Sequence, residues 1–354
     1  MAEVVEPKNK REEDLKMEKK KEILDYIREY TSSDDTKKII NLNYIINKEG
    51  FDIWSFKKLI FLENYLKLYL LILSDKYKSK CYFIDFFSSC GANKIEKGNI
   101  KSIGSPIISL LKGVIPNKKK NMNNRFFNWI FMEIDPTFCD VLKKRVEKTC
   151  EIIKEKTNED LKIDKDIKII CGDSNNLIDD LVLELEKESK TERIAVLAFI
   201  DPYRFSAIEW QSVKKLLSLK YVDIIFTLST GTLRRGVDIC KEKEKFLSPS
   251  LLKECSNKKF CDIPEEKIGD LYAKDIFDVV GRGINFFRKG ISVRNSVNTE
   301  IYRIELFSHS KKAVEIAESI AKKLDKLDYS TLSKLLDQTK GQPSLKNGFN
   351  RKFY

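Results

Sequence analysis

The feature that most constrains this chain is a regular alternation of apolar runs and helix-like segments between residues 81 and 229. The apolar runs are CYFIDFF (81–87), RFFNWIFMEID (125–135), IKIICGD (167–173), RIAVLAFIDP (193–202) and VDIIFTLS (222–229). A stretch with helical periodicity separates each run from the next. Nearly continuous apolar strands joined by helices are typical of a parallel sheet that is covered on both faces. We therefore predict an α/β, Rossmann-like fold.

The segments around this alternation divide the chain into three predicted parts. Residues 1–50 form a charged arm with a helical portion, and residues 31–50 within it lack clear periodicity and are predicted to be irregular. Residues 51–328 form the main domain, which starts with a helix from about Trp54 to Leu73. A helical insertion over about 231–283 follows the fifth strand, and two more strands follow the insertion. Residues 329–354 form a C-terminal helix and a basic tail.

The charge balance of the chain favours a polyanionic partner. The 354 residues include 66 Lys and Arg against 54 Asp and Glu, which gives a formal net charge of +12. Nucleic acid is the simplest such partner, and solvated lysine faces are the alternative explanation. The candidate nucleic-acid contacts are two arginines after the fifth strand and a lysine run: Arg234, Arg235, Lys118, Lys119 and Lys120.

The cysteine and histidine content makes a metal site improbable. None of the eight cysteines forms a CxxC pair, and His309 is the single histidine. The ligand spacing of zinc sites is therefore absent, and no metal is predicted. We interpret the cysteines as reduced thiols of a cytoplasmic protein. No apolar run reaches the roughly 18 residues that a membrane-spanning helix requires, and the first 22 residues do not resemble a signal peptide.

Four consecutive predicted strands each end at a carboxylate. These residues are Asp85, Glu133, Asp173 and Asp201. In an open parallel sheet, ligands bind outside the carboxyl ends of the strands. Any single one of these acids could be a helix N-cap or a solvated strand end. The ordered set favours a binding site at this edge of the sheet.

The turn after the first strand indicates which cofactor such a site would hold. Residues 85–91 read DFFSSCG and include Phe87, Ser89 and Gly91, so the glycine-rich fingerprint of pyrophosphate-binding loops is missing. S-adenosylmethionine has no phosphate and requires only close approach and a few polar groups. Glu133 is placed to accept ribose hydroxyls, and Asp173 with Ser174 to contact the adenine. The pattern therefore predicts S-adenosylmethionine as the cofactor.

Five stretches, taken together, resemble the three-Cys-motif partner family. They are WSFKKLIFLENYLKLYLLIL, YFIDFFSSCG, GSPIISLL, FIDPYRFSAIEWQSVKKLL and IYRIELFSHSKKAVEIAESI, within about residues 50–325. The resemblance implies a class I methyltransferase-like fold and a protein partner that carries a three-cysteine cluster motif. Ser89 stands where the family loop usually has its first glycine.

The stretch FIDPYRFS resembles the D-P-P-Y motif of amino methyltransferases, with one proline absent. The resemblance implies that Asp201 and the Pro202 carbonyl hold an exocyclic amine while Tyr203 stacks on its base. The expected function is an S-adenosylmethionine-dependent methyltransferase acting on nucleic acid, with a base amine as one candidate acceptor. The main alternative is an inactive methyltransferase-fold subunit that binds nucleic acid or a partner protein. A weaker alternative is a magnesium-dependent nuclease that uses the clustered acids.

Overall fold

The structure is a computed structural model of the chain. It describes residues 21–41, 44–47, 52–76, 79–95, 100–115, 125–235, 242–257, 259–281, 284–295, 297–325, 327 and 329–339.

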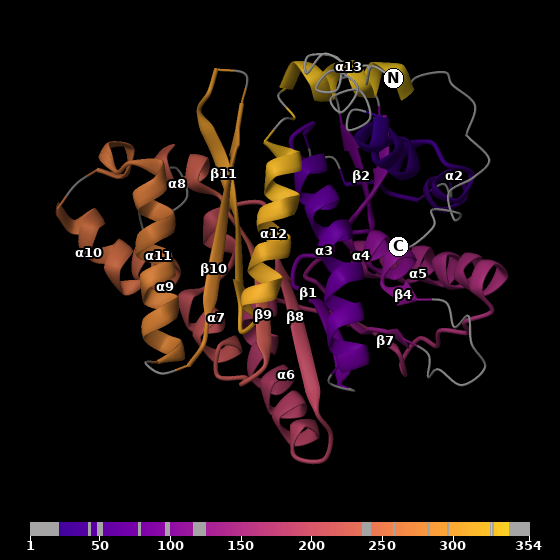
Figure 1. Cartoon of the computed structure of the whole chain (residues 1–354), viewed down its shortest axis with the longest axis horizontal. Helices are drawn as coiled ribbons and strands as arrows, with labels where there is room; N and C mark the ends of the chain where they lie inside the picture. The colour runs from indigo at the N-terminus through magenta and orange to yellow at the C-terminus, as the bar shows by residue number, and fades with distance from the viewer. Residues whose placement is uncertain are drawn as a thin grey trace, which may run out of the picture.

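A seven-stranded sheet forms the centre of the protein, with the strand order β10-β11-β9-β8-β1-β6-β7 (Figure 1). All neighbouring strands pair in parallel except β11, which runs antiparallel to both β9 and β10. This order with its single reversed strand is that of a class I methyltransferase fold, so the predicted fold class is confirmed. The strands are β1 (Lys80–Asp85), β6 (Asn128–Glu133), β7 (Ile167–Cys171), β8 (Ile194–Ile200), β9 (Val222–Leu228), β10 (Phe287–Arg294) and β11 (Glu300–Ser308).

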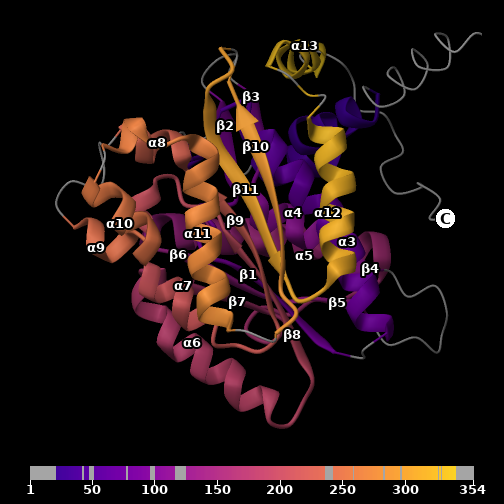
Figure 2. The same ribbon diagram turned by 60° about the vertical axis from the view of Figure 1, so that its left-hand side comes forward.

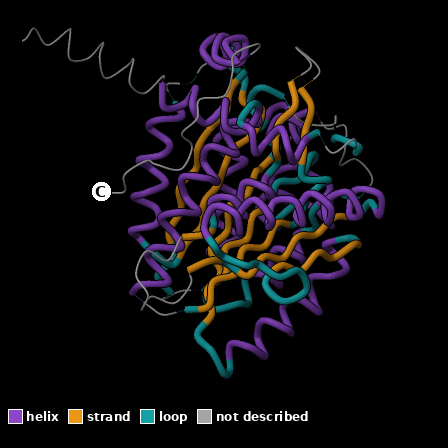
Figure 3. The backbone as a smooth tube through the Cα atoms, turned by 90° about the vertical axis from the view of Figure 1, so that its right-hand side faces the viewer, coloured by secondary structure: helices purple, strands orange, loops and turns teal. Residues whose placement is uncertain are grey.

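Helices cover both faces of the sheet because the strand side chains alternate between two hydrophobic cores (Figures 2 and 3). In β1, Phe83 lies in the first core and Ile84 in the second. Helices α3 (Ser55–Lys76), α4 (Ser105–Lys112), α5 (Pro136–Thr157) and α12 (Lys311–Leu324) supply the first core. Helices α6 (Ser174–Ser189), α7 (Trp210–Leu216) and α11 (Glu265–Val280) supply the second.

The described part of the segment between β9 and β10 is helical, as predicted. It contains α8 (Thr230–Arg235), α9 (Lys243–Phe246), α10 (Pro249–Asn257), a 3-10 turn (Phe260–Asp262) and α11. Buried ion pairs lie where α11 crosses β10 and β11. Glu305 pairs with Arg288 at 2.8 Å and with Arg303 at 3.1 Å. The glycine at 269 leaves room for these groups, since a Cβ there would lie 2.9 Å from both Glu305 and Arg303.

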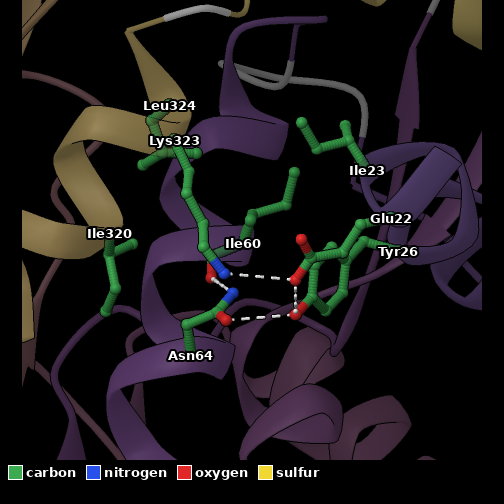
Figure 4. A pocket seen from close by; sticks show the side chains of 8 residues that line it. All are labelled: Glu22, Ile23, Tyr26, Ile60, Asn64, Ile320, Lys323 and Leu324. Atoms are coloured by element: carbon green, nitrogen blue, oxygen red, sulfur yellow. Dashed lines mark hydrogen bonds and ion pairs between the residues drawn. The ribbon is translucent and has the colours of Figure 1, made fainter. Parts of the chain in front are cut away.

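The helical residues 21–31 belong to the same core as the sheet. Ile27 and Tyr30 are fully buried in the first hydrophobic core. Figure 4 shows the small crevice that these residues form with α3 and α12, where the Tyr26 hydroxyl lies 3.0 Å from Asn64 Oδ1. Lys323 Nζ on α12 lies 3.3 Å from Glu22 Oε1, and both side chains line the same crevice. The described part of the N-terminal region is therefore packed onto the body of the protein.

Two local predictions were wrong in detail, and one element was missed. Residues 31–50 were predicted to be irregular, but α2 (Asp34–Ile40) forms there because the Ser33 side chain caps it at Thr36 N. The run 125–135 is not one strand, because β5 (Arg125–Phe126) pairs with β4 (Val114–Ile115) outside the main sheet. The segment between β1 and α4 contains an antiparallel pair, β2 (Ala92–Ile95) and β3 (Ile100–Ile103), which was not predicted.

The C-terminal helix α13 spans Tyr329–Thr339, and the basic tail lies outside the described residues. None of the helices in the described part of the chain has the length and apolar character that crossing a membrane would require.

Candidate active site

The central strand β1 ends at Asp85, between the ends of β6 and β8. Hydrogen bonds to both neighbours continue beyond this residue. Phe86 N donates to Phe199 O at 3.1 Å, and Ser88 N donates to Met132 O at 2.9 Å. The turn after β1 is thereby fixed from two sides, at the edge where open α/β sheets bind ligands.

The carboxyl group of Asp85 is fully buried and only partly satisfied. Its Oδ1 accepts a hydrogen bond from Phe87 N at 3.1 Å, whereas its buried Oδ2 has no hydrogen-bond partner among the described residues. Burial raises the pKa of Asp85 to about 7; the nearby Ser105 hydroxyl and Phe87 N–H oppose the shift, and the charges of Asp201 and Glu133 add to it. The Ser105 hydroxyl lies close to the carboxyl but makes no hydrogen bond of good geometry to Oδ2. A buried polar atom without a partner costs free energy. A ligand that hydrogen bonds to Oδ2 would remove that cost.

Two residues of the turn adopt left-handed backbone conformations. Ser89 has a φ of 52° and Gly91 a φ of 76°. The conformation that favours glycine is therefore present at Ser89, although the residue there is serine. A Cβ at residue 91 would lie 3.0 Å from Leu142 Cδ1, so a larger residue there would also crowd this side chain. The Ser89 hydroxyl is buried and has no hydrogen-bond partner among the described residues.

A buried arginine donates a hydrogen bond to the turn after β1, and the sequence did not indicate this role. Arg145 on α5 is fully buried, and its guanidinium donates to Cys90 O at 2.6 Å and to Ile45 O at 2.9 Å. Burial lowers the pKa of Arg145. No ion pair of this side chain occurs within the described ranges. Its position on the buried face of α5, between Leu142 and Val146, was the available signal.

Glu133 ends β6 beside the turn. Its Oε1 accepts a hydrogen bond from Asp135 N at 2.9 Å. Burial raises the pKa of Glu133, and the backbone N–H groups of Asp135, Ser89 and Ile134 offset part of this shift. The next side chain, Ile134, is 65% exposed. A carboxylate beside an exposed apolar side chain suits a ligand with sugar hydroxyls and a flat ring.

Hydrogen bonds connect the residues after β7 to the segment that follows β8. Asp173 caps α6 by accepting a hydrogen bond from Asn175 N at 2.9 Å, and Ser174 is buried in the first turn. Asn175 Oδ1 accepts hydrogen bonds from Glu209 N and from the Ser212 hydroxyl, both at 2.9 Å. Asp173 is therefore a helix N-cap, which was one of the roles considered for it. Asn175 connects the start of α6 to the residues around the start of α7, and the sequence did not reveal this contact.

Asp201, at the end of β8, forms an ion pair that was not predicted. Lys58 Nζ on α3 lies 2.8 Å from both carboxylate oxygens of Asp201. The same ammonium lies 5.2 Å from the centre of the Tyr302 ring, and the Tyr302 hydroxyl donates to Trp54 O at 2.6 Å. The carboxylate that was expected to hold a substrate amine is thus bound to an ammonium group of the protein.

The two residues after Asp201 differ in exposure. Pro202 is buried, whereas Tyr203 is 57% exposed, which rules out a core role for this ring. The Arg204 guanidinium lies 4.9 Å from the centre of the Tyr203 ring. An exposed aromatic ring with a stacked arginine is a suitable surface for a nucleobase.

The remaining predicted residues are placed as follows. Phe87 is partly buried and packs against the second core. Arg234 Nη1 pairs with Glu265 at 2.6 Å, and its Nη2 donates to Cys261 O at 3.1 Å. The side chain of Arg235 and all of Lys118–Lys120 lie outside the described residues. Within the described ranges, no cluster of three or more His, Cys, Asp or Glu side chains is arranged to hold a metal ion.

Comparison with known proteins gives only weak similarities. No family model and no curated protein matches this chain. Protein LPL1258 from Legionella pneumophila str. Philadelphia 1 is 10% identical, with a TM-score of 0.42 over 74% of this chain and 91% of that chain. The O-methyltransferase from Bacillus cereus in complex with SAH is 11% identical, with a TM-score of 0.34 over 70% of this chain and 80% of that chain. The METTL16 MTase domain is 14% identical, with a TM-score of 0.32 over 70% of this chain and 67% of that chain.

Proposed function

We propose that this protein is an S-adenosylmethionine-dependent methyltransferase that acts on nucleic acid. The observation that carries the proposal is the β1 turn. It follows Asp85, whose Oδ2 has no hydrogen-bond partner among the described residues, and contains the left-handed residues Ser89 and Gly91. The backbone N–H of Ser89 faces the carboxylate of Glu133. Such a turn allows a ligand to approach the backbone closely and offers it polar groups on two sides.

The residues at this edge fit the parts of S-adenosylmethionine. Glu133 would accept hydrogen bonds from the ribose hydroxyls, and the exposed Ile134 would pack against the adenine ring. The buried Asp85 would contact the polar methionine portion across the turn. When bound, S-adenosylmethionine supplies an electrophilic methyl group. The contribution of the protein is then to orient the acceptor atom in line with that group.

A nucleic-acid substrate is supported by charge and by the surface near Asp201. The chain carries a formal net charge of +12. Tyr203 and Arg204 form an exposed stacking surface directly after β8. Phosphate contacts from basic side chains would make binding strongly dependent on salt. The sequence resemblance also supports a partner protein with a three-cysteine motif, which we include in the proposal.

One observation favours a second function, a methyltransferase-fold subunit that binds nucleic acid without activity of its own. The Lys58 ammonium occupies both oxygens of Asp201, the residue that the D-P-P-Y resemblance assigns to an exocyclic amine. An acceptor amine would have to share this carboxylate with the ammonium of Lys58. A binding subunit requires no amine contact at Asp201.

Labelled S-adenosylmethionine with total RNA and total DNA separates the two functions. We expect wild-type protein to transfer label to one of the two pools. Asp201→Asn should lose transfer and still bind the methyl donor, while Asp179→Asn, which alters an exposed ion pair on α6, should behave like wild type. Tight nucleic-acid binding with no transfer would support the subunit instead. Absence of donor binding would refute both the cofactor and the methyltransferase assignments.

A further inference from the structure

We propose that the methyl acceptor is the 2′-hydroxyl oxygen of an RNA ribose, and that Lys58 contacts this oxygen. The inference rests on the proposed methyltransferase function and goes beyond it, because it names the acceptor atom and the type of nucleic acid. Its starting point is the ion pair between Lys58 and Asp201 at the carboxyl end of β8.

The pair is held in one geometry and remains accessible. Lys58 Nζ is 2.8 Å from each oxygen of Asp201, and the Tyr302 ring lies 5.2 Å from the same nitrogen. Tyr302 is itself fixed by its hydrogen bond to Trp54 O. The side chains of Lys58 and Asp201 are 14% and 18% exposed. A substrate can therefore reach two groups whose positions are set before it binds.

An amine acceptor does not suit this arrangement. The N–H groups of an exocyclic amine require hydrogen-bond acceptors, and each oxygen of Asp201 already shares its acceptor capacity with Lys58. An ammonium group has three donors and no acceptor, so Lys58 offers such an amine only another donor. The nitrogen of an amine also becomes positively charged as it attacks, and the ammonium of Lys58 beside it would disfavour that charge.

A hydroxyl acceptor suits it well. Lys58 directs two contacts at Asp201 and keeps a third N–H, which can donate to the lone pair of a substrate oxygen. The positive charge of Lys58, within hydrogen-bond distance of this oxygen, stabilises the negative charge that develops on the oxygen as it attacks. The new C–O bond forms as the C–S bond of the donor breaks, and the sulfonium becomes a neutral thioether. The hydroxyl proton passes to the carboxylate of Asp201 and then to water, while Lys58 stays protonated.

The acceptor chemistry also selects the polymer. The sugars inside a DNA strand carry no hydroxyl group, whereas each RNA nucleotide presents a 2′-hydroxyl as donor and acceptor. Tyr203, two residues after Asp201, offers an exposed ring on which the base of that nucleotide can stack. The pair and the ring together therefore match the sugar and base of one unpaired ribonucleotide.

The first test identifies the linkage made by the wild-type protein. RNA labelled with the methyl donor is hydrolysed in alkali, which cleaves the chain only next to an unmodified 2′-hydroxyl. We expect the label in alkali-resistant dinucleotides, and no label in DNA of the same sequence. Label in mononucleotides, or transfer to DNA, would overturn the inference while leaving the proposed methyltransferase function intact. Absence of donor binding would instead refute that function, and the inference with it.

The second test concerns Lys58. We expect Lys58→Met to lower kcat by about 100-fold or more, with donor affinity and melting temperature close to those of wild type. Lys58→Arg keeps the positive charge and should retain part of the activity. Lys215→Met removes an exposed ion pair with Asp179 on the α6–α7 surface and serves as the matched control. Equal kcat values for Lys58→Met and Lys215→Met would contradict the role of Lys58.

Discussion

The guanidinium of Arg145 donates a hydrogen bond to the carbonyl oxygen of Cys90 at 2.6 Å, which joins the buried face of α5 to the turn after β1. A second hydrogen bond joins the same side chain to Ile45 O at 2.9 Å. An internal cation of this kind costs solvation free energy and is retained where its hydrogen bonds fix a local geometry. Here the fixed geometry is that of the turn proposed to receive the methyl donor.

Replacing Arg145 with methionine should destabilise the protein by about 2–4 kcal/mol, because the carbonyl oxygens of Cys90 and Ile45 would lose their donor. Donor affinity should fall as well, since the turn loses its support. Urea unfolding and donor titration measure the two effects. Lys148→Met, which removes an exposed ion pair on the same helix, should change neither quantity. A variant at 145 as stable as wild type would contradict the supporting role.

Replacing Ser89 with glycine should leave the turn in place and raise stability by up to about 1 kcal/mol. The φ of 52° at this residue is strained for serine and unstrained for glycine. Ser88→Gly is the matched control. It should destabilise, because the buried Ser88 hydroxyl donates to Asp85 O at 3.1 Å. Chemical unfolding compares the stabilities of the two variants. A Ser89→Gly protein less stable than Ser88→Gly would contradict the interpretation that the backbone of Ser89 is strained.

The buried carboxyl of Asp85 should make stability depend on pH. Its pKa is about 7 in the folded protein, above the ordinary value, so the folded state binds this proton more tightly than the unfolded state does. The resulting stabilisation is complete below about pH 4 and is lost as the pH rises to about 7, by up to about 4 kcal/mol.

Asp85→Asn is neutral at every pH and should not show this loss. The stability of the variant relative to wild type should therefore be greater at about pH 8 than at about pH 5. Urea unfolding at the two pH values measures the difference. Parallel pH profiles for the two proteins would show that the Asp85 carboxyl has an ordinary pKa.

Replacing Glu133 with glutamine should weaken donor binding by about tenfold or more, because a charged acceptor for the ribose hydroxyls is lost. Asp135→Asn provides a control two residues away. Asp135 caps α5 through Thr137 N and Phe138 N, and asparagine is an equally good cap. Calorimetric titration of the donor should separate the two variants, and equal affinities would exclude Glu133 from the site.

The sheet and its edge could be predicted from the sequence because their signals are local. The apolar runs located the strands. Because the carboxyl ends of parallel strands lie at the same edge of a sheet, Asp85, Glu133 and Asp201 could be placed together there. The charges of Glu133 and Asp201 both raise the pKa of Asp85, which agrees with their convergence.

The parts that the sequence did not reveal depend on tertiary contacts. Lys58 and Asp201 are separated by 143 positions along the chain, and no local pattern links them. Arg145 lies within an ordinary amphipathic helix, where a single basic residue is usually solvated. The β2–β3 pair is only four residues long on each side, too short for its alternation to stand out from a loop.

The most direct measurement is a calorimetric titration of the purified wild-type protein with S-adenosylmethionine. We predict binding at one site with micromolar affinity, weakened by Glu133→Gln and unchanged by Asp135→Asn. An absence of binding at millimolar donor would contradict the proposal that the turn after β1 is a cofactor site.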